Sequence, residues 1–261
     1  MAIILGSAHQ GEFVTTDQFN RIPLVMLGNS GRVDGTSPLN AATTVRAGNF
    51  VMRNASNELI ISDGATVAGM ALYDVTTSPV GTEVDRPLVF ASSGGTAQLT
   101  RASGAAAVNV SNVGIRSAAG GTGTLYVGAG TDFSIVLSTG VVTHVGGGAI
   151  VVGATNFASF DYALTVAEAA RETNYIGSTD YVSIMQSGLL PIAVGAFEVM
   201  TSRFDKNRTY TLNGAGSILY VDSTGQLTNN SSSTVRVGRV KGLFTSATPR
   251  LWAQIDVGGL A

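Results

Sequence analysis

The chain has 261 residues, with 15 Lys and Arg, 17 Asp and Glu, two His and no Cys. A net charge of −2 leaves no basic excess for binding a nucleic-acid backbone, so we expect no nucleic-acid partner. The lack of Cys excludes a disulfide scaffold, a thiol nucleophile and a zinc site built on thiolates. Charged residues make up only 12% of the chain while 33 residues are Gly, which indicates a β-rich protein and not a disordered one.

The mean hydropathy of +0.28 is high for a chain without a membrane segment. Its longest apolar runs, such as residues 2–5 and 24–27, fall far short of the ~20 residues that a membrane-spanning helix needs. No Lys or Arg precedes Arg21, so we expect no signal peptide. The composition therefore predicts apolar surface that is buried against other subunits, with a homotrimer preferred and no membrane partner.

Residues 1–45 are expected to form an extended N-terminal arm, because scattered glycines and prolines leave one plausible strand at Ile22–Leu27. Such an arm either drapes over its own domain or reaches a neighbouring molecule. Its apolar patch needs a partner, so we expect it to contribute to attachment more than to folding. The candidate interaction residues are Ile22, Leu24, Val25, Met26 and Leu27.

Residues 46–90 are expected to form a small β-barrel-like module. Two β-prone runs, 49–53 and 58–61, are separated by the turn residues 54–57, which predicts a hairpin. A further strand is expected at 66–75, and an apolar run follows at 88–90.

The same pattern recurs 168 residues later without a gap. This shift places Gly48 on Gly216, Leu59 on Leu227 and Thr66 on Thr234. A looser third copy begins at Tyr181 and ends at Gly195. Each copy has one residue just before its return strand that is expected to have positive φ, because a short hairpin loop must turn sharply there. These residues are Asn57, Gly188 and Gly225.

The middle region, residues 91–160, is rich in Gly and poor in charge. Short β-prone runs at 124–127, 133–137, 141–145 and 149–152 predict a β-sandwich or jelly-roll-like unit.

The last region, residues 161–261, is expected to form a β module with one short helix near 164–173. Thr165 and Glu168 make a capping box, and alanines favour a helix after it. The predicted fold class is therefore all-β, with small antiparallel barrel or sandwich modules and this single helix.

Residues that could carry chemistry are few. His144 lies in a β-prone run whose alternation predicts an exposed or sheet-edge side chain with a structural role. Residues 121–126 begin like a dinucleotide fingerprint, but Tyr126 stands where the third Gly belongs. The carboxylates are dispersed. We therefore expect no enzymatic activity, no cofactor and no metal site.

The runs Val45–Val51 and Val67–Leu72, which flank the first hairpin, resemble small β-barrel modules of tailed-bacteriophage virion proteins. The C-terminal runs 194–199, 216–221 and 237–240 are similar to them too. This resemblance implies a decoration or cement protein that binds the major capsid protein on the outside of the head, after assembly in the host cytoplasm.

Two other classes stay open. One is another virion component, such as a tail, baseplate or host-binding fibre protein, although a fibre should show longer tandem repeats. The other is a carbohydrate-binding or enzymatic β protein, for which more exposed aromatic residues than the single Trp252 are expected.

Overall fold

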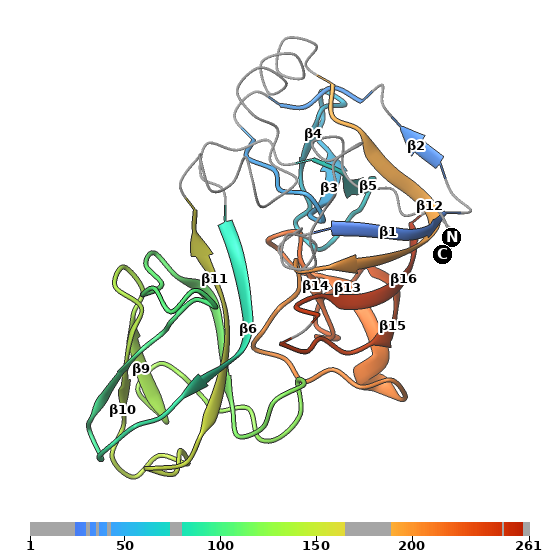
Figure 1. Cartoon of the computed structure of the whole chain (residues 1–261). Helices are drawn as coiled ribbons and strands as arrows, with labels where there is room; N and C mark the ends of the chain where they lie inside the picture. The colour runs from blue at the N-terminus through green and yellow to red at the C-terminus, as the bar shows by residue number, and fades with distance from the viewer. Residues whose placement is uncertain are drawn as a thin grey trace.

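A computed structural model describes residues 24–29, 32–34, 37–40, 43–73, 80–164, 189–246 and 248–257. These residues form antiparallel β-sheets and one short 3₁₀ turn at Ala215–Ser217, which confirms the all-β class. Figure 1 shows two lobes, one built on a ten-stranded sheet and one built from the middle of the chain. The helix expected near 164–173 lies, apart from Leu164, outside the described residues.

The ten-stranded sheet contains strands from the arm, from the first module and from the C-terminal module. Its strands are β1 (Leu24–Asn29), β2 (Arg32–Asp34), β3 (Phe50–Arg53), β4 (Leu59–Ile61), β5 (Gly69–Ala71), β12 (Ile192–Thr201), β13 (Ile218–Val221), β14 (Leu227–Thr228), β15 (Arg236–Gly242) and β16 (Leu251–Val257). The regions 46–90 and 161–261, expected as separate modules, thus share one sheet.

The sheet consists of two halves with the same strand order. Its strand order is β14-β13-β15-β16-β12-β5-β3-β4. From either end inward, the order is the second hairpin strand, the first hairpin strand, the third strand and a long central strand. The central strands β12 and β16 pair antiparallel from Gly195↔Val257 to Thr201↔Leu251. The halves are therefore related by a pseudo-two-fold rotation.

The strand bounds and pairings support the 168-residue repeat. β3 and β4 coincide with β13 and β14 after the shift, and the pair Arg53↔Leu59 becomes Val221↔Leu227. The third strands β5 and β15 also overlap, although their pairing with β3 and β13 differs by one residue. The hairpin of the third, looser copy falls on residues outside those that the structure describes.

The two hairpin turns have the same hydrogen bonds at equivalent positions. The Asn54 side chain accepts from the backbone N–H of Ser56 and Glu58, and Asp222 accepts from Thr224 and Gln226 in the same way. Positive φ is confirmed at Asn57 (63°) and Gly225 (73°), whereas Gly188 lies outside the described residues. The sequence repeat is thus a repeat of backbone structure.

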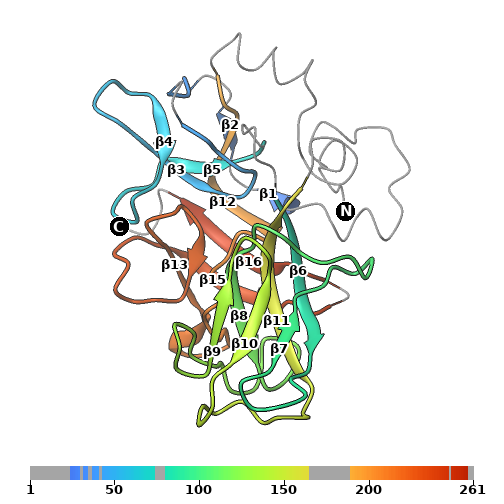
Figure 2. The same ribbon diagram turned by 90° about the vertical axis from the view of Figure 1, so that its left-hand side faces the viewer.

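The middle lobe is inserted between the third and fourth strands of the first half. In the second half, β15 is followed directly by β16, but in the first half the whole middle lobe separates β5 from β12. Its strands form two three-stranded sheets, β6-β11-β8 and β7-β10-β9 (Figure 2). The bounds are β6 (Val80–Leu88), β7 (Thr96–Gln98), β8 (Ser111–Arg116), β9 (Phe133–Val136), β10 (Val141–His144) and β11 (Asn156–Ala163).

The boundaries of the middle lobe differ from those expected. The lobe begins with β6 at Val80 and not at residue 91, because β6 pairs with β11 from Leu88↔Asn156 to Val80↔Ala163. This long antiparallel pair brings the two ends of the lobe together. An insertion whose ends lie side by side can enter a loop of the sheet without separating the strands that it interrupts.

Two strands expected in the middle region do not form, at residues 124–127 and 149–152. The carboxylate of Asp132, which is buried, accepts the backbone N–H groups of Val127 and Ala149, both at 2.7 Å. A side chain therefore satisfies these two donors, and neither segment extends into a strand. Residues 124–126 still contact β8 through an isolated antiparallel bridge between Leu125 and Arg116. The strands expected at 133–137 and 141–145 form as β9 and β10.

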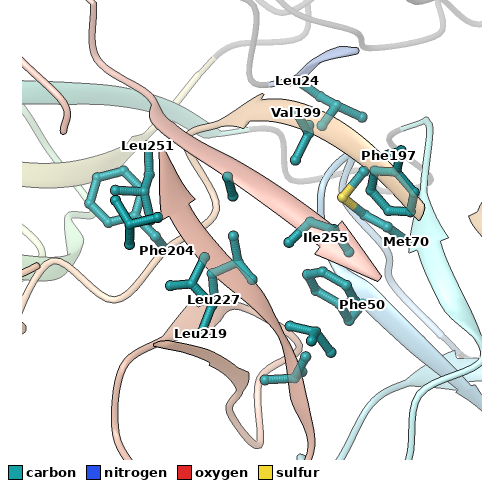
Figure 3. Packing of buried hydrophobic residues seen from close by; sticks show 14 of the residues in the cluster. Leu24, Phe50, Met70, Phe197, Val199, Phe204, Leu219, Leu227, Leu251 and Ile255 are labelled. Carbon is teal, nitrogen blue, oxygen red and sulfur yellow. The ribbon is translucent and has the colours of Figure 1, made fainter. Parts of the chain in front are cut away.

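The ten-stranded sheet with its two equivalent halves is called the double sheet below, and its largest hydrophobic core lies between the halves. Figure 3 shows Phe50 from the first half beside Ile255 from the second, and Met70 beside Phe197. Phe50 and Ile255 are fully buried. The middle lobe has a separate core that includes Phe90, Phe160 and Tyr162.

Candidate interaction site

The candidate interaction residues in the arm lie on or beside β1, which is part of the ten-stranded sheet. β1 pairs antiparallel with β12, from Leu24↔Thr201 to Asn29↔Phe197. Leu24 and Met26 are buried in the core of the double sheet, and Leu27 is half-buried. Val25 pairs with Met200 through the backbone, and Ile22 lies outside the described residues.

The described part of the arm therefore drapes over its own domain, which was one of the two alternatives. Leu24 and Met26 already pack within the chain, so we infer that these two residues contribute to folding and not to attachment. The physical reason is the exposed edge of β12, whose backbone groups β1 satisfies while it covers the core.

Replacing Leu24 by Ala should lower the free energy of unfolding by about 2–3 kcal/mol, the lower part of the usual range for buried Leu. The lower part applies because β1 pairs with one strand only and can relax toward the void. Urea unfolding of the full chain measures this change. Leu212→Ala is the control, since that side chain is 52% exposed and should give a change within about 0.5 kcal/mol. Equal effects of the two changes would contradict the burial of Leu24.

Buried charged side chains connect the middle lobe to the double sheet. Lys206 Nζ donates to Asp161 Oδ1 at 2.9 Å and Arg203 lies 3.8 Å from the other carboxylate oxygen. All three side chains are almost completely buried. Asp161 belongs to β11 of the middle lobe, whereas both cations follow β12 of the double sheet, so the ion pairs join the two lobes.

Asn112 and Arg116, both on β8, extend this contact through hydrogen bonds to the loop after β12 and to the turn between β13 and β14. Asn112 Nδ2 donates to the Phe204 carbonyl oxygen at 2.9 Å and to Gln226 Oε1 at 3.1 Å. Arg116 donates to the carbonyl oxygens of Lys206 and Arg208. Gly114 lies between them, where a Cβ would overlap the Lys206 carbonyl oxygen. The lobes therefore meet through specific, directional contacts.

The pKa values of the buried pair follow from burial and from the neighbouring charges. Burial by itself would raise the pKa of Asp161, but the charges of Lys206 and Arg203 and the hydrogen bonds from Thr82 and Lys206 lower it overall. Burial lowers the pKa of Lys206, and the attraction of Asp161 opposes this shift only in part. Because these groups are closed to solvent, their arrangement serves to hold the lobes together.

His144 is buried at 4% exposure in β10, the middle strand of its sheet, so the expected exposed or sheet-edge position is wrong. Its Nδ1 accepts from the Gly94 N–H at 3.4 Å, which leaves Nε2 to donate to the Ile150 carbonyl oxygen at 3.0 Å. Its ring also meets Phe90 edge to face. Backbone groups from other segments thus hold the imidazole, and the alternation of buried and exposed residues along its own strand does not predict these partners.

The described ranges contain no group of three or more His, Cys, Asp or Glu side chains that could hold a metal ion. They also contain no helix that is long and apolar enough to cross a membrane.

A polar cleft of about 400 Å³ lies where loops of the two halves meet. Asp63 and Asp222 line it from opposite halves, together with the hydroxyl groups of Ser232, Ser233 and Thr234. Thr234 Oγ1 and the Val235 N–H donate to the Gly64 carbonyl oxygen, which fixes the loops to each other. The cleft therefore offers hydrogen-bonding groups from two loops that are bonded to each other.

Exposed apolar side chains gather on the middle lobe. Among the described residues, these are Val89, Val108, Val127, Val136, Leu137, Val151 and Val152, with exposures from 39% to 63%. Backbone hydrogen bonds tie Gly153 to Phe90 and Val110 to Leu137, so Val89 lies near Val151 and Val152, and Val108 lies near Val136 and Leu137. Sequence reasoning missed these residues. A signal was available for all of them except Val108, since the others belong to the apolar or β-prone runs expected at 88–90, 124–127, 133–137 and 149–152.

Comparison with models of known protein families, with curated proteins and with solved structures finds no match to this chain.

Proposed function

We propose that this protein is a structural component of a tailed-bacteriophage virion, a decoration protein that binds the outside of the head and stabilises capsomer junctions. The observation that carries the proposal is the apolar surface of the middle lobe. A lobe that exposes valines in groups, on a chain with only 12% charged residues, is suited to burial against other subunits.

The internal duplication supports the same function. Two equivalent half-sheets around one core give a rigid platform, while the inserted lobe lies to one side of it (Figure 1). A scaffold of this kind presents surfaces in fixed relative positions, as a protein that bridges capsomers requires. The proposal includes the resemblance of the hairpin runs to phage virion modules, and it assigns the protein no catalytic role.

A direct test is electron microscopy of the purified full chain mixed with expanded empty phage capsids. Added density at regular positions on the outer surface of the shell is the expected result. Binding confined to tails or baseplates would favour another virion component, and the absence of binding to any virion part would overturn the proposal.

The protein alone should be a homo-oligomer, with a trimer expected, because the exposed valines of the middle lobe need a partner. Val151, at 63% exposure, is a suitable position for the test, since a charge there would be buried without a partner in an interface. We expect Val151→Glu to weaken association at least about tenfold, which corresponds to about 1.4 kcal/mol. Sedimentation analysis at micromolar concentration measures this change.

Val33→Glu is the matched control, because Val33 has a similar exposure of 52% but lies on β2 of the double sheet. It should leave association unchanged. A wild-type chain that is monomeric at micromolar concentration would contradict the prediction.

A further inference from the structure

The outer face of the double sheet carries a row of cations on β15. Arg236, Arg239 and Lys241 are exposed, whereas Val237, Gly238 and Val240 between them are buried. Residues three apart on a regular strand face opposite sides of the sheet. In this pair of strands, Leu219 of β13 pairs with Gly238, but the next residue, Tyr220, pairs with Arg236. Val237 is therefore an extra residue in a β-bulge, and both arginines face outward.

Within the part of the chain that the structure describes, the side chains of these three cations make no hydrogen bond and no ion pair. In contrast, Arg53 pairs with Asp34 and Arg208 with Asp205 on other parts of the surface. In a chain with 15 Lys and Arg, three unpaired cations within six residues of one strand form a local positive surface on a molecule of net charge −2.

The neighbouring strands complete this surface. Arg239 lies directly across from Ile218 on β13 and from Gln254 on β16. A depression of about 170 Å³ is lined by the two arginines and by Gln254 and Asp256. Trp252, further along β16, is 36% exposed and packs against Gly242 at the end of β15. Arg and Trp are the residue types that contribute most to binding at protein interfaces.

We propose that this face of β15 and β16 is a docking surface for an extended acidic segment of another protein. Carboxylates of the segment would pair with Arg236, Arg239 and Lys241, and an apolar side chain beside them would contact Trp252. Guanidinium groups suit this task because they bind carboxylates in a bidentate manner. The inference rests on the proposed function for the source of the segment, which is a shell protein.

An acidic peptide fits this face better than a nucleic acid does. Glu198 on β12 lies directly across from Gln254, and Asp256 lines the depression, so carboxylates border the cationic row. A continuous phosphate backbone would meet these negative charges, whereas a short segment can place its few carboxylates over the arginines alone. Neutralising Asp256 should therefore strengthen binding.

The first experiment measures fluorescence anisotropy of a labelled peptide with six glutamates and one Leu, using the full-length protein at low salt. Arg236→Gln and Arg239→Gln should each weaken binding at least about fivefold, and Asp256→Asn should strengthen it about two- to threefold. Arg53→Gln is the matched control, which removes the same charge from β3 and should leave affinity unchanged. Circular dichroism checks that each variant is folded.

The second experiment locates the peptide on the surface. The chain has only two lysines, and the side chain of Lys206 is fully buried, so Lys241 is the accessible one. Carbodiimide coupling of the peptide carboxylates, followed by mass spectrometry, should give a cross-link at Lys241 that Lys241→Gln abolishes.

Three results would overturn the inference: equal binding of a glutamine peptide, an unchanged affinity in both arginine variants, or tighter binding of a single-stranded oligonucleotide than of the acidic peptide. Failure of the proposed function would give a result different from these three. In that case the peptide binds as expected, but the protein does not bind empty capsids.

Discussion

Replacing Asp161 by Ala should lower the free energy of unfolding by about 3–5 kcal/mol, because Lys206 and Arg203 would stay buried without a counter-charge. The ion pair also joins the two lobes, so their relative positions should become less fixed. Urea unfolding, followed by circular dichroism, measures the stability. Arg208→Ala provides the control, since its pair with Asp205 is exposed to solvent and its loss should cost less than about 1 kcal/mol.

A double-mutant cycle separates the pair from general damage to the interface. The variant with both Asp161→Ala and Lys206→Met should be more stable than the sum of the two single changes predicts, by about 1–3 kcal/mol. Strict additivity would show that the two charges do not interact, which would contradict the 2.9 Å contact.

Acid should weaken the wild-type protein through the same residue. The pKa of Asp161 in the folded chain is below its ordinary value of 3.8, since the nearby cations outweigh the effect of burial. Its stabilising contribution is therefore fully present above this ordinary value, which is the pKa in the unfolded chain, and is lost as the pH falls through the lower folded value. Comparing urea midpoints between pH 5 and pH 2 tests this, because Asp161→Asn should show a smaller loss than the wild type.

Replacing Gly225 by Val should lower the free energy of unfolding by about 4 kcal/mol. The positive φ of 73° is unfavourable for a β-branched residue and costs about 1–3 kcal/mol. In addition, a Cβ would lie 2.6 Å from the Phe50 carbonyl oxygen, so the turn of one half would have to move away from the other, at about 1–3 kcal/mol. Chemical unfolding of the purified variant measures the sum.

Asn57 offers the matched position in the other half of the repeat. It also has positive φ, at 63°, but its side chain is exposed, so Asn57→Gly should change the stability by less than about 0.5 kcal/mol. A Gly225→Val variant as stable as Asn57→Gly would mean that the second turn does not have the left-handed conformation.

The sequence by itself determined the features that depend on residues close together in the chain. Both hairpins, the 168-residue repeat and the positive φ of Asn57 and Gly225 follow from strand-forming runs separated by turn residues, and the all-β class follows from the lack of extended helical patterns. These signals are local, because a short turn restricts the backbone whatever the rest of the chain does.

Only the tertiary structure decided how these pieces combine. The pairing of β12 with β16, the insertion of the middle lobe and the burial of Leu24 on β1 depend on contacts between distant segments. Asp161 and Lys206 show the reason, since neither residue's neighbours in the sequence reveal that a partner 45 residues away will compensate its buried charge. From the sequence, a carboxylate or an imidazole such as that of His144 is known only to be a polar group. Whether it is exposed or buried is decided by the partners that the fold supplies.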